Sequence, residues 1–392
     1  MHTQGFAKRL KARSHEKRTR RAWSGGLFSA LLCVSVGTFA QSSGDHQTTA
    51  GPLASYRVEV VATDLRVPWS IVFTPDGRLL FTERPGRLRV IKDGKLRPEP
   101  LLTLPDVDTT LKMGLMGMAL HPKFGDTHWL YLAYTYKDAD KSWLRVVRYR
   151  ESGDKLRERS VVIECIPAAT NHAGCRIKFG PDGKLYVTTG DADHPKSAQA
   201  MDSLAGKTLR LNDDGSIPGD NPFAGQQGAR PEIWSYGHRN SQGLDWQPVT
   251  NLQFQTEHGP DGGDEVNTLK PGENYGWPVV HHEQTHSEME SPLLVYTPSV
   301  APAAGLFYRS SAFPELKNNF LFACLRGQCI VRLVLEGERV VRQERLLEKQ
   351  FGRIREIAEA PDGTLYFSTS EFDPPEGKGR VAYDQILRLV PR

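Results

Sequence analysis

Short runs of alternating hydrophobic and polar residues recur along this chain around a common turn. Three segments share the pattern, in which an apolar run leads into Pro-Asp-Gly and an alternating run leaves it, at residues 72–83, 178–190 and 358–369. Alternation with a period of two is typical of half-buried strands. Pro-Asp-Gly supplies a preset φ, a capping carboxylate and a residue that accepts positive φ. Each segment therefore predicts a β-hairpin.

Three weaker copies of the hairpin pattern lie between these segments, at residues 119–135, 245–256 and 313–323. Successive units start about 45 to 70 residues apart, which is enough for a four-stranded blade and a loop. We therefore predict an all-β fold, a six-bladed β-propeller whose blades are four-stranded antiparallel sheets around a central channel. A multi-sheet sandwich is the alternative.

Two alternating segments at the ends of the repeats, residues 56–61 and 385–390, predict how the ring closes. Propellers usually pair an N-terminal strand with a C-terminal strand in one blade. We expect these two segments to pair in that way.

The N-terminus has the layout of an export signal. A basic stretch runs to Arg21, an apolar stretch covers residues 26–40, and polar residues 41–44 follow. The apolar stretch is too short for a confident membrane span. We predict a signal peptide at 1–40 cleaved near Ala40, a flexible lead-in at 41–54 and one propeller domain at 55–392. The protein would then be periplasmic or secreted, with the choice between twin-arginine and general export left open.

Composition changes this picture in two ways. Removing eight bases and one acid with the leader turns the formal net charge of +4 into −3, so the basic balance gives no support for nucleic-acid binding. Four cysteines remain in an oxidising compartment, and Cys324 with Cys329 predicts a local disulfide. Cys165 with Cys175 is a second candidate pair. The absence of a Cys-x-x-Cys motif argues against structural zinc.

His172 is the first candidate for chemistry. It precedes the strand that enters the Pro-Asp-Gly turn at 181–183, and Asp191 follows the strand that leaves it. An antiparallel hairpin would bring both side chains to the same end of one blade. A carboxylate on one imidazole nitrogen fixes the tautomer and leaves the other nitrogen as a base. Alone, this spacing is more typical of a polar loop histidine than of a catalytic one.

Three further segments carry dense charge. Arg239 and Asn240 lie on a glycine-bracketed loop, where arginine offers a donor fork for an oxyanion. Residues 256–267 place carboxylates among glycines, which suits Ca²⁺. Arg353 and Arg355 alternate along a strand, so both face one side and attract an anion. Each segment alone also fits an ordinary structural role.

Taken in order, these motifs resemble the soluble PQQ-dependent glucose and aldose sugar dehydrogenases. The resemblance spans roughly residues 57–391, essentially the whole mature chain. The motifs are Asn-His-x-Gly-x-Arg (171–176), Thr-x-Gly-Asp (188–191), Gly-His-Arg-Asn-x-Gln-Gly (237–243), Glu-His-Gly-Pro-x-Gly-Gly-Asp-Glu-x-Asn (257–267), Asn-Tyr-Gly-Trp-Pro (274–278) and Arg-Ile-Arg (353–355).

The resemblance implies three catalytic residues in a six-bladed propeller that holds pyrroloquinoline quinone (PQQ) and Ca²⁺ at the mouth of its channel. His172 matches the base that takes the proton from the sugar C1 hydroxyl while a hydride passes to the quinone. Asp191 matches the carboxylate that orients this base. Arg239 matches the residue that faces the reactive quinone carbonyls.

The resemblance also implies the residues that bind the cofactor and metal. Asn240, Arg353 and Arg355 match cofactor contacts. Gly259 and Pro260 match carbonyl ligands of the cofactor-bound Ca²⁺. Glu265 and Tyr275 match ligands of a second, structural Ca²⁺.

The chain departs from the family pattern at three cofactor positions. Lys112 stands where the family usually has Gln, and Arg326 stands where it has Lys. A Tyr that covers the cofactor in bacterial relatives falls at His286. These changes leave the base unaltered and alter the rim of the cofactor site.

We therefore expect PQQ-dependent oxidation of aldoses to lactones, with electrons passing to an external acceptor. The expected partners are a small aldose and that acceptor, with no nucleic acid and no membrane span in the mature chain, which would be a monomer or homodimer. One alternative is a Ca²⁺-dependent propeller lactonase or other hydrolase. Another is a non-catalytic propeller that serves as a binding module.

Overall fold

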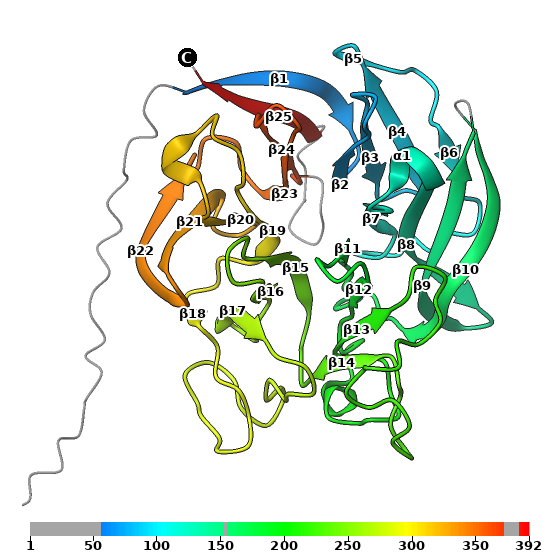
Figure 1. The fold of residues 1–392 in the computed structure, drawn as a ribbon, viewed down its shortest axis with the longest axis vertical. Helices are drawn as coiled ribbons and strands as arrows, with labels where there is room; N and C mark the ends of the chain where they lie inside the picture. The colour runs from blue at the N-terminus through cyan, green and yellow to red at the C-terminus, as the bar shows by residue number, and fades with distance from the viewer. Residues whose placement is uncertain (1–55, 153–154, 372–383, 392) are drawn as a thin grey trace, which may run out of the picture. The chain divides into compact units, whose positions relative to one another are not determined.

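The computed structural model describes residues 56–152, 155–371 and 384–391, and these form six antiparallel sheets arranged around a central axis (Figure 1). The prediction of a six-bladed β-propeller is confirmed. The predicted signal peptide and the predicted lead-in both lie outside the described residues. Within the described ranges, no helix is long and apolar enough to cross a membrane.

The first three blades follow one another along the chain, and in each the first strand lies nearest the axis (Figure 1). Their strands are β2 (Pro68–Phe73), β3 (Leu79–Glu83), β4 (Arg87–Lys92), β5 (Lys95–Leu96) and β6 (Leu102–Thr103); β7 (Leu115–Leu120), β8 (Trp129–Asp138), β9 (Lys141–Glu151) and β10 (Leu156–Pro167); β11 (Ile177–Phe179), β12 (Leu185–Thr188), β13 (Lys207–Leu211) and β14 (Ile233–Tyr236). Both β5 and β6 pair with β4 at the outer edge of the first blade.

The remaining three blades repeat this order, and the last blade takes its outer strand from the N-terminus. Their strands are β15 (Ser241–Trp246), β16 (Gln253–Glu257), β17 (Asp264–Leu269) and β18 (Leu294–Tyr296); β19 (Pro302–Phe307), β20 (Phe320–Cys324), β21 (Cys329–Glu336) and β22 (Arg339–Leu346); β23 (Ile354–Glu359), β24 (Leu365–Thr369), β25 (Asp384–Pro391) and β1 (Tyr56–Leu65). The short helices are α1 (Phe124–Thr127), η1 (Pro195–Ala198) and η2 (Pro314–Leu316).

The ring closes in the way that the two terminal segments predicted. Strand β1 pairs antiparallel with β25, with Val58 opposite Leu389. A second link crosses to the first blade, where the Val67 amide donates to Oδ2 of Asp384 at 3.0 Å. The two ends of the described chain are therefore joined by a continuous sheet.

The direction of the strands places the Pro-Asp-Gly turns at one end of the propeller and the candidate catalytic residues at the other. In each blade the first two strands form a hairpin, and in three blades this hairpin carries the Pro-Asp-Gly turn. Because the strands are antiparallel, the loops between blades and the loop after each second strand gather at the opposite end. His172, Asp191 and Arg239 all lie on such loops, so the hairpin topology brings them to one end of the channel.

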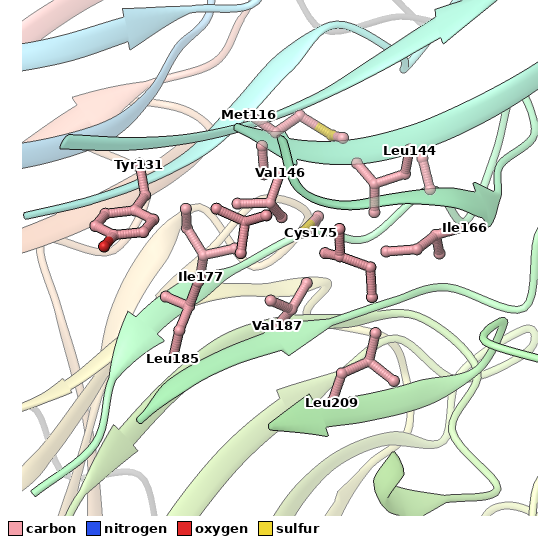
Figure 2. Close-up of a cluster of buried hydrophobic side chains, with 14 of the residues drawn as sticks. Met116, Tyr131, Leu144, Val146, Ile166, Cys175, Ile177, Leu185, Val187 and Leu209 are labelled. Carbon is pink, nitrogen blue, oxygen red and sulfur yellow. The ribbon is translucent and has the colours of Figure 1, made fainter. Parts of the chain in front are cut away.

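The largest apolar cluster lies between the second and third blades (Figure 2). Ile177 and Val187 of the third blade pack with Val146 and Leu144 of the second, and each of these side chains is essentially buried. Full burial of such a side chain stabilises a fold by about 1.5–3 kcal/mol. This packing fixes the two blades between which the His172 loop runs.

All four described cysteines are free thiols in this structure. Cys324 and Cys329 are fully buried and directly opposite each other across the β20–β21 hairpin. Cys175 is buried in the apolar cluster, whereas Cys165 is exposed beside the Tyr136 hydroxyl at 3.7 Å. Of the two predicted disulfide pairs, the structure therefore brings together Cys324 and Cys329 only.

We expect protein exported through an oxidising compartment to carry a disulfide between Cys324 and Cys329. Closing so short a loop stabilises the fold by about 2 kcal/mol in the chain-entropy account. Mass spectrometry of the peptide spanning both residues, with and without reductant, measures the bond. Two free thiols in protein purified from that compartment would contradict the prediction, and Cys165 should stay reactive in either case.

Candidate active site

A cavity of about 690 Å³ opens at the end of the channel where the inter-blade loops gather. Its walls come from all six blades or the loops that join them. The predicted residues that line it are Lys112, His172, Arg239, Asn240, Gly259, Arg326, Arg353 and Arg355. Residues up to 243 positions apart in the chain thus meet in one space, as the resemblance implied.

The other predicted residues lie around this cavity rather than along it. Asp191 is fully buried behind His172, and Pro260 lies between the lining residues Gly259 and Asp261. Glu265 is in a separate cluster with Tyr275 and His286. His286 is not among the residues that line the central cavity, where a place at the rim was predicted, because the 270–293 segment carries it to the separate pocket that Glu265 also lines.

His172 and Asp191 form a part-buried hydrogen-bonded pair. Nδ1 of His172 lies 2.8 Å from Oδ1 of Asp191, and the His172 side chain is 19% exposed while Asp191 is fully buried. A carboxylate accepts a hydrogen bond from an Nδ1–H donor, so the Nδ1–H tautomer is favoured. The unprotonated Nε2 is then the nitrogen available for taking a proton in the cavity.

Close backbone packing explains the glycine before Asp191. A Cβ at Gly190 would overlap the carbonyl oxygen of His172, so only glycine fits there. His172 itself has a φ of +50°, in a region that residues with a side chain rarely occupy. The Ala192 amide donates to the His172 carbonyl at 3.3 Å, and this contact supports the loop in that conformation.

Asp193 and Trp277 extend the pair and were not singled out from the sequence. Oδ1 of Asp193 lies 3.4 Å from Nδ1 of His172. The Trp277 indole Nε1 donates to Oδ2 of Asp191 at 2.8 Å. Trp277 belongs to the Asn-Tyr-Gly-Trp-Pro motif, which was the sequence signal for it. His172, Asp191 and Asp193 together could also hold a cation, since their ligand atoms lie within 4.8 Å of one another.

Arg239 lies beside this pair with its side chain fixed from two sides. Its Nη1 donates to the His258 carbonyl at 3.0 Å, and its backbone amide donates to the Glu257 carboxylate. The guanidinium lies 5.2 Å from the centroid of the Trp277 ring. Burial lowers the pKa of Arg239 from its usual value, and the Asp191 and Glu257 carboxylates oppose that shift.

The cavity carries an excess of positive charge. Its lining includes six cationic side chains, Arg84, Lys112, Arg239, Arg326, Arg353 and Arg355, against the three carboxylates of Asp261, Asp264 and Glu371. Buried Nε–H groups of Arg239 and Arg353 have no hydrogen-bond partner among the described residues. Such donors fit an anionic ligand. Arg84 was not found from the sequence because no motif marks it.

A network of amides and charges forms the cavity floor. The Gln242 side chain donates to the carbonyl of Gly174 at 3.2 Å and to Oδ1 of Asn240 at 3.1 Å, and it accepts from Arg355 at 3.2 Å. The Gly174 amide also donates to Asn240, at 3.3 Å. Asn240 and Arg355 are thereby fixed to the loop that carries His172.

The turn at residues 259–264 contains a buried carboxylate. Oδ1 of Asp264 accepts from the Gly259 amide at 3.0 Å, and Oδ2 accepts from the amides of Val300 and Ala301 at 2.8 and 2.7 Å. Asp264 lines the cavity although only 1% of it is exposed. Its negative charge and the adjacent backbone oxygens make this the part of the cavity suited to a hard cation.

A second group of oxygen atoms surrounds Glu265 outside the cavity. Burial raises the pKa of Glu265 to about 8, and the neighbouring Glu257 carboxylate adds to the shift. Oδ1 of Asn267 is buried with no hydrogen-bond donor among the described residues, while its Nδ2 donates to Glu265 at 3.0 Å. An unpaired amide oxygen beside a buried carboxylate fits a bound cation.

Together, the fold and the cavity define a six-bladed propeller with a cationic central site and a part-buried His–Asp pair. The chain belongs to the glucose/sorbosone dehydrogenase family, whose model matches residues 65–378. The family resemblance found in the sequence motifs is thereby confirmed.

Named relatives cover nearly the whole chain. The chain is 35% identical over 358 residues to aldose sugar dehydrogenase YliI of Escherichia coli, covering 86% of this chain and 94% of the relative. Among solved structures, a Thermus thermophilus oxidoreductase described as a glucose dehydrogenase is 43% identical with a TM-score of 0.78, covering 86% of this chain and 100% of that one. The PQQ-bound form of aldose sugar dehydrogenase from Streptomyces coelicolor is 32% identical with a TM-score of 0.74, covering 87% and 99%.

Proposed function

We propose that this protein is a quinoprotein aldose dehydrogenase, which oxidises the C1 hydroxyl of aldose sugars to lactones with PQQ as its cofactor. The observation that carries this proposal is the pairing of a cationic cavity with a His–Asp base at its edge. Membership of the glucose/sorbosone dehydrogenase family and similarity to a PQQ-bound relative support it.

The residues present fit PQQ, which carries three carboxylates. Six cationic side chains against three carboxylates leave an excess that matches such an anion. Arg353, Arg355 and Arg326 would hold the cofactor carboxylates, with Lys112 adding charge from the first inter-blade segment. When bound, PQQ supplies the two-electron acceptor that the protein's own side chains lack.

His172 performs the proton transfer in this proposal. Its Nε2 takes the proton of the sugar C1 hydroxyl, while Asp191 holds the Nδ1–H tautomer and stabilises the imidazolium that results. With PQQ bound, Arg239 would supply the positive charge that stabilises a developing oxyanion. Asn240, which lines the cavity and is held by Gln242 and Gly174, would contact the cofactor.

Calcium is the second group that we propose. The backbone carbonyls of Gly259 and Pro260 would bind the ion that accompanies the cofactor, close to the charge of Asp264. A structural ion would bind Glu265 and the backbone oxygen of Tyr275, since the Tyr275 hydroxyl already donates to the Thr268 carbonyl at 2.6 Å. The unpaired oxygen of Asn267 beside Glu265 is consistent with this site.

Removing calcium from the cofactor-free protein should lower its Tm by about 5 °C, because an ion at 100 times its Kd stabilises the fold by about 3 kcal/mol. Differential scanning calorimetry with chelator and with added Ca²⁺ measures the shift. Glu265→Gln should abolish the calcium response. Glu336→Gln, which alters only an exposed ion pair with Arg339, should retain it. A Tm that is the same with and without Ca²⁺ in the wild type contradicts the structural site.

The two alternative functions predict other features. A Ca²⁺-dependent hydrolase does not require six cationic side chains in its cavity, because its acyl substrate carries no comparable negative charge. A non-catalytic binding module does not need a strained His172 backbone held against Gly190 and a buried Asp191. Both observations favour the dehydrogenase.

Steady-state assays separate these functions. In the first assay, mature protein prepared without cofactor is supplied with PQQ and Ca²⁺, and dye reduction is followed with a panel of aldoses. In the second assay, hydrolysis of lactones by the same protein is measured. We expect PQQ-dependent dye reduction and no hydrolysis. Hydrolysis without PQQ would replace the proposal with the lactonase, and inactivity in both assays would favour the binding module.

We also infer that the enzyme works in the periplasm or outside the cell and passes electrons to an external acceptor. The basic and apolar leader before residue 41 supports export. N-terminal sequencing of the exported protein should begin just after Ala40. A start at Met1 in active protein would contradict this inference.

A further inference from the structure

The Trp277 side chain joins two parts of the site that come from different blades. Its indole nitrogen donates to Oδ2 of Asp191 at 2.8 Å, and its ring centroid lies 5.2 Å from the Arg239 guanidinium. The other oxygen of Asp191 accepts from His172 at 2.8 Å and from the Asp193 amide at 3.0 Å. Both carboxylate oxygens are thus bonded, and the indole is the side-chain donor to one of them.

The backbone of Trp277 is held firmly enough to place this indole. Its amide donates to the Gly237 carbonyl at 2.9 Å, and its carbonyl accepts from the Gln199 side chain at 2.8 Å. Gln199 and Asn274 also bind each other through both amide groups, at 2.8 and 2.9 Å. Gln199 belongs to the same β12–β13 connection as Asp191, so this one loop holds both the backbone and the side chain of Trp277.

We propose that Trp277 is a positioning residue, which fixes the Asp191 carboxylate and through it the His172 ring. Asp191 is fully buried, so water cannot replace a lost donor at Oδ2 without rearrangement of the loop. Trp277 does not line the cavity, and it therefore acts through Asp191 and Arg239 rather than on the substrate. The catalytic part of this inference rests on the proposed function of His172 as the base.

The test compares two tryptophans in matched surroundings. Trp277→Phe keeps an aromatic ring beside Arg239 and removes the N–H donor. Trp234→Phe is the control, because Trp234 also donates to a side-chain oxygen and also has an arginine 5.0 Å from its ring. Its partner is Gln253, at 2.9 Å, rather than the Asp191 carboxylate that holds His172. A loss of general indole packing would affect both variants alike.

The first readout uses cofactor-free protein and requires no activity. The Nδ1 proton of His172 is observed by NMR of ¹⁵N-histidine-labelled protein and is assigned by its absence from His172→Gln. We expect slow exchange with water in the wild type and in Trp234→Phe, and exchange about ten-fold faster or more in Trp277→Phe, because the carboxylate that holds the proton is freed on one side. Trp277→His, which restores a ring N–H, should recover part of the protection.

The second readout uses enzyme loaded with PQQ and Ca²⁺. We expect kcat of Trp277→Phe to fall about 10- to 100-fold with KM nearly unchanged, because a misplaced base affects the chemical step and not sugar binding. Wild-type proton exchange in Trp277→Phe overturns the positioning role. Faster exchange in that variant, with no aldose turnover by the wild type, supports the positioning role and overturns the proposed function. If Trp277→Phe fails to fold, an unprotected His172 proton in folded Trp277→His overturns the proposal.

Discussion

Replacing His172 with glutamine is expected to lower kcat for aldose oxidation by about 10³-fold while PQQ remains bound. General bases contribute about 10² to 10⁴ to enzymatic rates, and glutamine cannot accept the proton at neutral pH. The side chain lines the cavity but contributes none of its positive charge excess, so the cofactor contacts of Arg353 and Arg355 should persist. Stopped-flow kinetics and equilibrium dialysis of PQQ measure the two quantities.

His121→Gln is the matched control for this prediction. His121 also faces an aspartate, with 3.9 Å between its Nε2 and Oδ2 of Asp213, but it lies outside the central cavity. Its replacement should leave kcat and PQQ affinity within about two-fold of the wild type, as for most substitutions outside a site. Near wild-type turnover by His172→Gln would show that another group is the base.

Replacing Arg239 with methionine is expected to lower kcat by about 10²-fold or more, with a smaller effect on KM. Removing one preorganised donor to developing negative charge costs about 10² to 10³ in kcat. Methionine keeps much of the side-chain volume against the Trp277 ring and removes the guanidinium. Arg239 is also one of six cations in the cavity, so PQQ affinity should fall as well, but five cations remain to hold the cofactor.

Arg148→Met is the control for Arg239→Met. Arg148 lies 4.4 Å from the Trp129 ring in the second blade, away from the cavity, so the same cation–π contact is lost without any change in the site. The kcat of the Arg148→Met variant should equal that of the wild type. If Arg239→Met kept its full kcat at saturating PQQ and sugar, Arg239 would be a cofactor-binding residue without a role in the chemical step.

Local sequence patterns predicted the architecture because each blade contains its own signal. The Pro-Asp-Gly hairpins show where the inner strands begin, and six copies determine the number of blades. The pairing of His172 with Asp191 follows from the same hairpin, since both residues flank one antiparallel pair of strands. Contacts that lie within one hairpin are therefore accessible to sequence reasoning.

Contacts between loops of different blades were not accessible in the same way. Trp277 reaches Asp191 only because the long 270–293 segment folds back towards the preceding blade, and no periodicity encodes that path. In the same segment, His286 lines the separate pocket that Glu265 also lines, rather than the central cavity, at whose rim its sequence position suggested it would lie. Arg84 lines the cavity from a loop whose sequence resembles an ordinary charged turn.

The central claim is that this cavity binds PQQ and uses it to oxidise an aldose. Anaerobic titration of cofactor-free protein with PQQ in the presence of Ca²⁺, followed by addition of an aldose without any dye, tests that claim most directly. The account predicts one PQQ bound for each chain, a change in its absorbance to that of the reduced cofactor on sugar addition, and one equivalent of lactone. Stoichiometric binding with an unchanged spectrum for every aldose, or no binding, would contradict it.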